Sequence, residues 1–123
     1  MRLTQLTPFI LCADLDRAIG FYEGILGFTL GFRQDNYAFL RRDQAALRLI
    51  MVDDDTDLTA PDRENSIYID VEDLDAVFAE MKPRLDKLKS DRVRAPFNQA
   101  YGQREFHIYD EDCTLVFFGE AIT

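Results

Sequence analysis

Apolar residues recur with two different spacings along this chain, and the same succession of spacings occurs twice. Residues 7–22 read TPFILCADLDRAIGFY, and residues 66–81 read SIYIDVEDLDAVFAEM. Each stretch begins with an apolar, strand-like run, continues through Asp-Leu-Asp and ends in a helix-like pattern. Asp14 and Asp73 are equivalent positions, 59 residues apart. A repeat of this length indicates that one supersecondary unit has been duplicated.

Both helices are predicted from the 3.6-residue period and from their end signals. Asp14 is placed to accept the free amide hydrogens of the first helix, and Gly27 supplies a left-handed stop. Asp73 takes the same capping place in the second helix, which Pro83 is expected to end or kink near Lys82. The apolar stripes are Leu15, Ala18, Ile19, Tyr22, Ile25 and Leu26 in the first helix, and Leu74, Val77, Phe78, Met81 and Leu85 in the second.

Short β-forming runs separated by polar turns predict three strands after each helix. They cover residues 29–33, 37–42 and 46–52 in the first half, and 92–97, 103–109 and 114–118 in the second. The polar, acidic segment 53–65 is interpreted as a linker. The sequence therefore predicts an α+β fold in one domain, residues 1–123, with two βαβββ modules at about 1–58 and 66–123. One module alone leaves a sheet face bare, so two must pair within or between chains.

Length and charge narrow the class of protein. A chain of 123 residues can bury a core without disulfides, and no apolar run approaches the roughly 20 residues of a membrane helix. Residues 1–5 lack the apolar segment of a signal peptide, so we expect a cytoplasmic protein. The formal charge of −9 makes nucleic-acid binding improbable and would concentrate a cationic ligand, although acidic surfaces also simply keep proteins soluble. The two cysteines, Cys12 and Cys113, are too few for a multi-cysteine zinc site and are expected to be free thiols.

Three segments resemble the glyoxalase, bleomycin-resistance and extradiol-dioxygenase superfamily, which has the vicinal oxygen chelate fold. They are ADLDRAIGFYEGILGF (13–28), IYIDVEDLDAVFAEM (67–81) and YGQREFHIYDEDCTLVFFGE (101–120). Within that superfamily the chain looks most like the bleomycin resistance proteins, on Pro8, Gly27-Phe28 and the run from Tyr101 to Phe106. The resemblance implies two cupped mixed sheets. It also implies a crevice at a subunit interface that holds a drug with a planar heteroaromatic unit and a cationic tail.

Metal-dependent members of the superfamily use His, Glu or Gln ligands on the first and last strands of the two modules. Alignment on the repeat and on the acidic turn at residues 110–113 places these positions at Thr7, Ser66 and Phe117. The matching strand of the first module, residues 46–52, has no carboxylate, imidazole, amide or thiol. These residues cannot form a metal site of the family type, so neither a metal nor another cofactor is predicted, and no catalytic residue is assigned.

His107 is the only histidine and shares a strand face with Glu105, two residues earlier. The two side chains could form a hydrogen-bonded pair, but they do not supply three metal ligands. We interpret His107 as a surface or crevice-edge residue on a half-exposed strand. Contact with a ligand, or a role as a general base, remains the alternative.

The predicted ligand-binding residues are aromatic, with one carboxylate. The chain has ten Phe, five Tyr and no Trp, and aromatic faces bind planar ligands and cations. Carried over by motif, the binding residues are Phe32, Tyr37, Tyr68 and Tyr101, with Asp70 offering a negative charge. Ordinary sheet packing is the alternative for each of them. Phe9, Phe78 and Phe106 are assigned instead to the core.

Pro8 removes a ladder donor and fixes one backbone angle, which suits an edge or exchanged strand. In the proteins that this chain resembles, a proline here marks an N-terminal arm that swaps between subunits. We therefore expect a strand-swapped homodimer with two equivalent crevices.

Three functions compete at this point. The first is a metal-free dimeric protein that sequesters a cationic or aromatic small molecule. The second is a divalent-metal-dependent glyoxalase- or dioxygenase-like enzyme with an atypical site. The third is a partner-binding module whose groove is filled by its own side chains.

Overall fold

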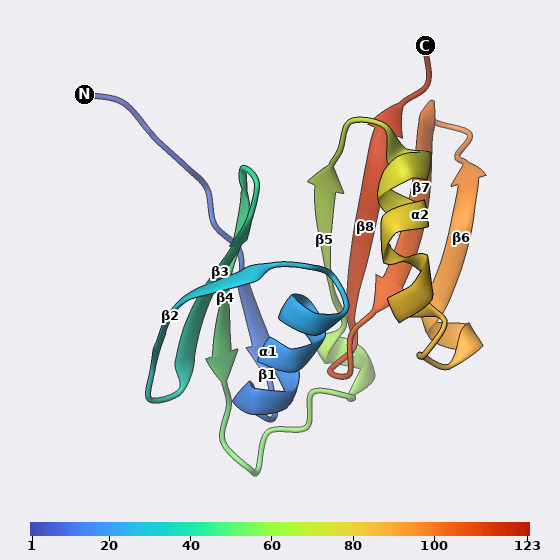
Figure 1. The fold of residues 1–123 in the computed structure, drawn as a ribbon. Helices are drawn as coiled ribbons and strands as arrows, with labels where there is room; N and C mark the ends of the chain where they lie inside the picture. Colours follow the sequence, from blue (N-terminus) through green and yellow to red (C-terminus); the bar gives the residue numbers. More distant parts are fainter.

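The computed structural model describes residues 1–123 as two sheets of four strands, each with one α-helix (Figure 1). The first module contains β1 (Phe9–Cys12), α1 (Leu15–Gly24), β2 (Thr29–Gln34), β3 (Tyr37–Arg42) and β4 (Ala45–Met51). The second contains β5 (Asn65–Asp70), α2 (Leu74–Leu85), β6 (Val93–Asn98), β7 (Gln103–Tyr109) and β8 (Thr114–Ala121). Two short 3₁₀ helices, η1 (Pro61–Arg63) and η2 (Ser90–Arg92), precede β5 and β6. The predicted α+β class and the βαβββ order are confirmed.

Both sheets are mixed and follow the same plan. The strand orders are β1-β4-β3-β2 and β5-β8-β7-β6. In each module the first strand runs parallel to the last, as in the pairing of Ile10 with Leu49, and the remaining pairs are antiparallel. Because neighbouring side chains on a strand point to opposite faces, each sheet has one face toward its helix and one face away from it.

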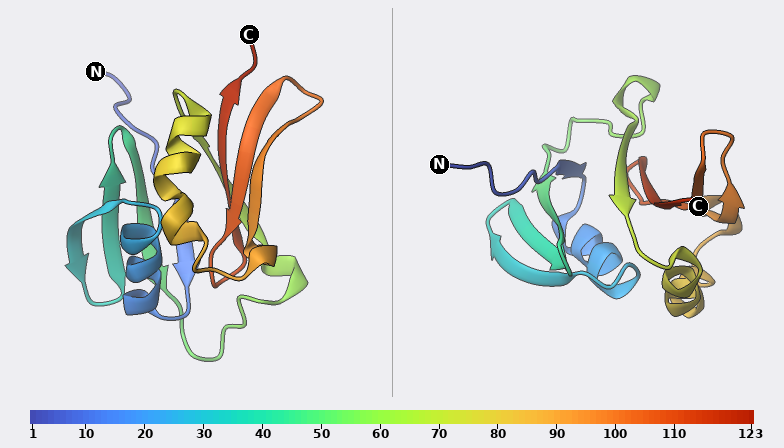
Figure 2. Two further views of the ribbon diagram at one scale, coloured as in Figure 1. Left: turned by 45° about the vertical axis from the view of Figure 1, so that its right-hand side comes forward. Right: turned by 90° about the horizontal axis from the view of Figure 1, so that it is seen from above.

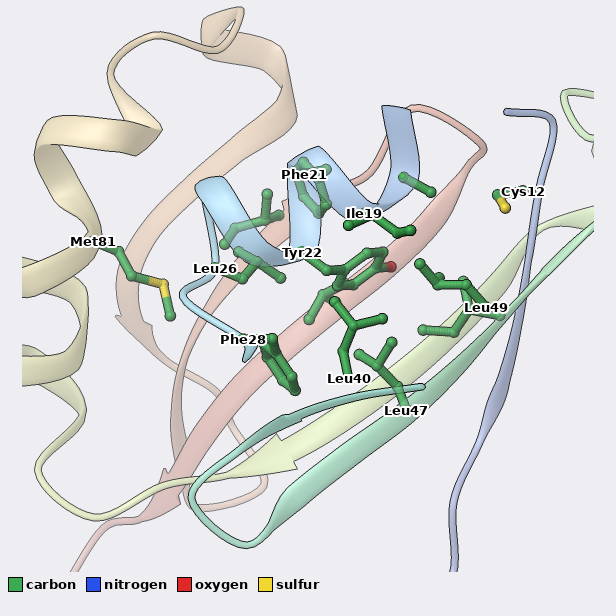
Figure 3. Packing of buried hydrophobic residues seen from close by; sticks show 14 of the residues in the cluster. Cys12, Ile19, Phe21, Tyr22, Leu26, Phe28, Leu40, Leu47, Leu49 and Met81 are labelled. Atoms are coloured by element: carbon green, nitrogen blue, oxygen red, sulfur yellow. The ribbon is translucent and has the colours of Figure 1, made fainter. Parts of the chain in front are cut away.

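The helix-bearing faces of the two sheets share one hydrophobic core of 20 buried residues. In Figure 3, Ile19 and Tyr22 of α1, and Leu26 just after it, lie over Leu40, Leu47 and Leu49 of the first sheet. Met81 of α2 belongs to the same cluster, as do Phe106, Ile108, Val116 and Phe118 of the second sheet. The two helices lie on the same side of the sheets, as Figure 2 shows, and the opposite sheet faces carry no helix.

Helix α1 has the end signals that its sequence predicts. The Asp14 side chain accepts a hydrogen bond from the Arg17 amide at 3.0 Å. Gly27 has φ of +80°, and a Cβ there would lie 2.9 Å from Nη1 of Arg42. That guanidinium donates to the Leu26 carbonyl at 2.7 Å, so glycine serves both the left-handed turn and the close approach of Arg42.

The Asp73 cap predicted for helix α2 is wrong, and so is an end near Lys82. Asp73 adopts a left-handed conformation and makes no capping bond; the Glu120 carboxylate, from β8, accepts from the Asp73 and Leu74 amides at 3.0 Å each. The helix also continues through Pro83 to Leu85. Its last turn is held by burial of Leu85 and by Arg84, which donates to the Glu80 carboxylate and to the Ile25 carbonyl of α1.

Polar contacts join α1 to the β7–β8 turn of the other module. The Tyr22 hydroxyl donates to Oδ2 of buried Asp110 at 2.9 Å, while Oδ1 accepts from the Asp112 and Thr114 amides. Arg17 pairs with Glu111 at 2.7 Å and with Asp112 at 3.0 Å. Burial raises the pKa of Asp110, although the hydrogen bonds it accepts oppose that change. These contacts fix the two modules with their helices facing inward.

Replacement of Tyr22 by Phe should lower the free energy of unfolding by about 1–2 kcal/mol, because it removes a donor from a buried carboxylate. Tyr109→Phe is the matched control, since that hydroxyl bonds Glu64 at the surface, and it should cost less than about 0.5 kcal/mol. Urea unfolding of both variants at neutral pH measures the difference. Equal losses in the two variants would contradict this role for Tyr22.

Candidate functional site

The first open face is the side of the β1–β4 sheet opposite α1. Phe9, Arg48, Phe39 and Phe32 lie side by side across its four strands. The Arg48 guanidinium lies over the rings of Phe39 (5.1 Å) and Tyr37 (6.0 Å) and donates to the Tyr37 hydroxyl. Phe9 is 61% exposed, so its assignment to the core is wrong, whereas Phe106 and partly buried Phe78 belong there.

The second open face is the side of the β5–β8 sheet opposite α2, and it carries a continuous strip of rings. Tyr68 stacks on Phe117 with ring centres 5.7 Å apart, and Phe117 lies 4.1 Å from His107. His107 meets the edge of Phe97 at 5.1 Å, and the Arg94 guanidinium lies 3.5 Å from the Phe97 ring centre. A β-bulge at Ala95-Pro96 places both Arg94 and Phe97 on this face.

Glu105, from β7, lies beneath this strip with no exposed surface. Its Oε1 accepts from Nε2 of His107 (2.8 Å) and Nε2 of Gln99 (3.0 Å). Its Oε2 accepts from the hydroxyls of Tyr101 (2.6 Å) and Tyr68 (2.9 Å). Burial raises the pKa of this carboxyl, but the four hydrogen bonds outweigh burial and lower the pKa to about 2. Glu105 is therefore a fully hydrogen-bonded anion at neutral pH.

The same arrangement changes both tyrosines. Burial, and then the hydrogen bond to Glu105, raise the pKa of Tyr68; that hydrogen bond is the main cause of the raised pKa of Tyr101. Both hydroxyls stay protonated, and both rings remain partly exposed on the open face.

Gly119 allows Tyr68 to reach Glu105. Tyr68 is on β5 and Glu105 is on β7, so the tyrosine must cross the intervening strand β8. A Cβ at position 119 would lie 1.9 Å from the Tyr68 hydroxyl oxygen, which is too close for any side chain there. The strip and the buried anion therefore depend on a glycine in the middle of the second sheet.

The structure divides the predicted ligand-binding residues between two faces. Phe32 and Tyr37 are in contact on the first, with ring centres 6.0 Å apart. Tyr68 and Asp70 lie on β5 and belong to the second face, and Tyr101 lies in the turn between β6 and β7. No ring contact within the chain joins the two groups.

His107 differs from its interpretation as a half-exposed edge residue. It is 8% exposed, between Phe97 and Phe117, although the hydrogen-bonded pair with Glu105 is confirmed. The sequence reasoning placed Glu105 only beside His107, and it missed Phe97 and Gln99 as parts of this face. A usable signal was the alternation of polar Gln103, Glu105, His107 and Tyr109 with Phe106 and Ile108 along β7.

The side chains at the family's metal positions do not fit a metal ion. Thr7 precedes β1, Ser66 lies on β5, and Phe117 is part of the ring strip. On β4, the side chains on the open face are Ala46, Arg48 and Ile50. No three side chains among His, Cys, Asp and Glu lie close enough together to hold a metal ion.

A separate cleft of about 410 Å³ lies between the modules, between the β3–β4 turn and the β5–α2 junction. Phe28, Ile69, Val71 and Phe118 supply its apolar lining. Asp70 is the only predicted ligand-binding residue there, so this cleft is not the aromatic site. No helix of the protein is long and apolar enough to cross a membrane.

Comparisons with known proteins agree with this architecture. The family model described as "Glyoxalase/Bleomycin resistance protein/Dioxygenase superfamily" matches residues 2–116. No curated protein matches the sequence.

Several solved structures share the fold along nearly the whole chain. A bleomycin-binding protein complexed with bleomycin is 26% identical, with a TM-score of 0.80, over 96% of this chain and 98% of that one. The bleomycin-binding protein from Streptomyces verticillus, complexed with copper(II)-bleomycin, is 22% identical, with a TM-score of 0.78, over 96% of each chain. A lactoylglutathione lyase from Agrobacterium tumefaciens is 18% identical, with a TM-score of 0.70, over 97% of this chain and 95% of that one.

Replacement of Gly119 by Ala should lower the free energy of unfolding by about 1–3 kcal/mol, because the added methyl displaces the Tyr68 ring. Gly20→Ala is the matched control: nothing lies within 4 Å of the added Cβ, and alanine favours the helix by up to about 1 kcal/mol. Chemical unfolding measures both changes. Equal stability of Gly119→Ala and the unmodified protein would contradict the close approach of Tyr68.

Proposed function

Because the chain belongs to the glyoxalase/bleomycin resistance protein/dioxygenase superfamily, we propose that it is a metal-free, dimeric binding protein of the bleomycin-resistance type. It sequesters a small cationic or aromatic molecule without altering it. The observation that carries this proposal is the second open face. There a strip of rings lies over a buried carboxylate, and the strip includes Phe117, at a position where the resemblance puts a metal ligand in family enzymes.

The chemistry of this face suits a planar cation. Aromatic rings attract cations through their electron-rich faces and stack on flat ligands. Tyr68 and Tyr101 are exposed, and Asp70 adds an exposed carboxylate on the same strand face as Tyr68. The overall charge of −9 favours the approach of a cation.

The first open face supports dimerisation. It exposes Phe9, Leu11 and Phe32 together, an apolar patch of the kind that marks an interaction surface. Its cations, Arg41 and Arg48, are opposite in charge to Asp70, an exposed carboxylate of the second open face. A twofold dimer that sets the first open face of one subunit against the second open face of the other forms two equivalent crevices, each containing all five predicted ligand-binding residues.

The N-terminal arm, residues 1–8, fits the same assembly. It projects from the first sheet, as Figure 1 shows, and the Leu3 and Leu6 side chains are exposed. Its one backbone hydrogen bond to the rest of the chain runs from the Arg48 amide to the Pro8 carbonyl, at 3.0 Å. In the proposed dimer this arm lies on the partner subunit, with Pro8 at the crossing point.

Isothermal titration with metal-free bleomycin tests the proposed function. We expect saturable heat at micromolar drug, and about tenfold weaker binding for Tyr101→Ala, which removes an exposed ring and one of the four donors to Glu105. Ile122→Ala, which shortens an exposed side chain just after the end of β8, is the control and should bind normally. Absence of saturable heat would contradict the bleomycin-type function, and heat that requires Ni²⁺, Mn²⁺ or Fe²⁺ salts would favour the enzyme alternative.

A further inference from the structure

Glu105 fixes the direction of every hydrogen bond that it makes. An ionised carboxylate only accepts hydrogen bonds, so each of its partners must donate. Both oxygens are fully engaged by protein groups, two donors on each. Glu105 therefore has no direct bond to offer a ligand, and it acts on the open face only through the groups that donate to it.

Each tyrosine hydroxyl has a single proton, and it donates that proton in a hydrogen bond to Glu105. Tyr101 has its hydroxyl 2.6 Å from Oε2 of Glu105. Tyr68 lies 2.9 Å from the same atom and 3.3 Å from Oε1 of Gln103, so its proton goes to the nearer, charged acceptor. What the two hydroxyls offer to a ligand is an oxygen lone pair.

The imidazole of His107 is fixed in the same way. Its Nε2 must carry the proton that binds Glu105, so in the neutral ring Nδ1 has a lone pair. No protein group donates to Nδ1, and it is not among the buried atoms without a partner, so it reaches solvent. His107 lies on the second open face, which places this lone pair beside the ring strip.

We propose that Glu105 is a positioning residue that makes Tyr68, Tyr101 and His107 a patch of hydrogen-bond acceptors, selecting flat ligands that carry N–H donors. The ligand class is amino-substituted heteroaromatic, amidinium or guanidinium cations; anions, and flat cations without N–H groups, bind less well. The inference rests on the proposed function in taking the second open face as one wall of the ligand site. Arg94, the cation on this face, is stacked on Phe97 at the outer strand β6.

Three acridine probes separate the hydrogen-bonding pattern from shape and charge. Proflavine is a planar cation with amino donors, 10-methylacridinium is a planar cation without N–H groups, and acridine-9-carboxylate is an anion. Fluorescence titrations at pH 8 compare the three probes. We expect the wild-type dimer to bind proflavine at least about tenfold more tightly than 10-methylacridinium, and the carboxylate more weakly than either.

Glu105→Gln keeps the shape of the side chain but replaces one carboxylate oxygen by an amide nitrogen, which donates. A hydroxyl or imidazole next to that nitrogen no longer donates to residue 105, so its hydrogen can point toward the ligand. The preference for proflavine over 10-methylacridinium should fall to about twofold or less. Glu64→Gln is the matched control: it removes one charge from another tyrosine–glutamate pair, with Tyr109, and should keep the preference. If Glu105→Gln does not fold, Tyr101→Phe decides, since it removes one acceptor and should reduce the preference about threefold.

Three results would overturn the inference. The first is equal affinity of the wild type for the two cations, and the second is no proflavine binding at about 1 mM. The third is a preference that is unchanged in both Glu105→Gln and Tyr101→Phe. These results are separable from the proposed function. Bleomycin binding without the acridine preference would retain the function and reject the role of Glu105. The acridine preference without bleomycin binding would retain the role of Glu105 and reject the bleomycin-type function.

Discussion

Each module supplies a single helix, so each sheet can bury only one of its faces. The two helix-bearing faces share one core, and the Tyr22–Asp110 hydrogen bond and the Arg17 ion pairs hold α1 against the second module. The other two faces are consequently left open, with aromatic residues on both. The proposed crevice follows from this constraint, because one chain carries both walls of the proposed site but does not bring them together.

The second open face is organised around a buried anion. A buried anion binds four side chains, and the absence of a side chain at Gly119 lets Tyr68 cross a strand to join them. The rings are therefore already oriented in the unbound chain, which would reduce the entropy lost on binding of the proposed ligand. Glu105 gives the face its chemical character while remaining entirely out of contact with solvent.

The sequence predicted the features that depend on the spacing of residues within one segment, but not those that depend on contacts between distant residues. The βαβββ order and the Asp14 cap follow from hydrophobic spacing within one segment. The cap of α2 comes from Glu120, 46 residues beyond Leu74, so the repeat misleadingly suggested Asp73. Phe97 was missed because the bulge before it breaks strict alternation. The pairing of Glu105 with His107 was predicted, but its bonds to Tyr68, Gln99 and Tyr101 were missed because these donors lie on other segments.

Complementation between two defective variants tests the central claim, that each crevice combines open faces from two subunits. One variant carries Tyr37→Ala on the first face, and the other carries Tyr68→Ala and Tyr101→Ala on the second. Each should bind bleomycin weakly as a homodimer. After subunit exchange, every mixed dimer has one intact crevice, so titration should recover wild-type affinity at reduced stoichiometry. Mixtures that bind no better than their components would contradict the account.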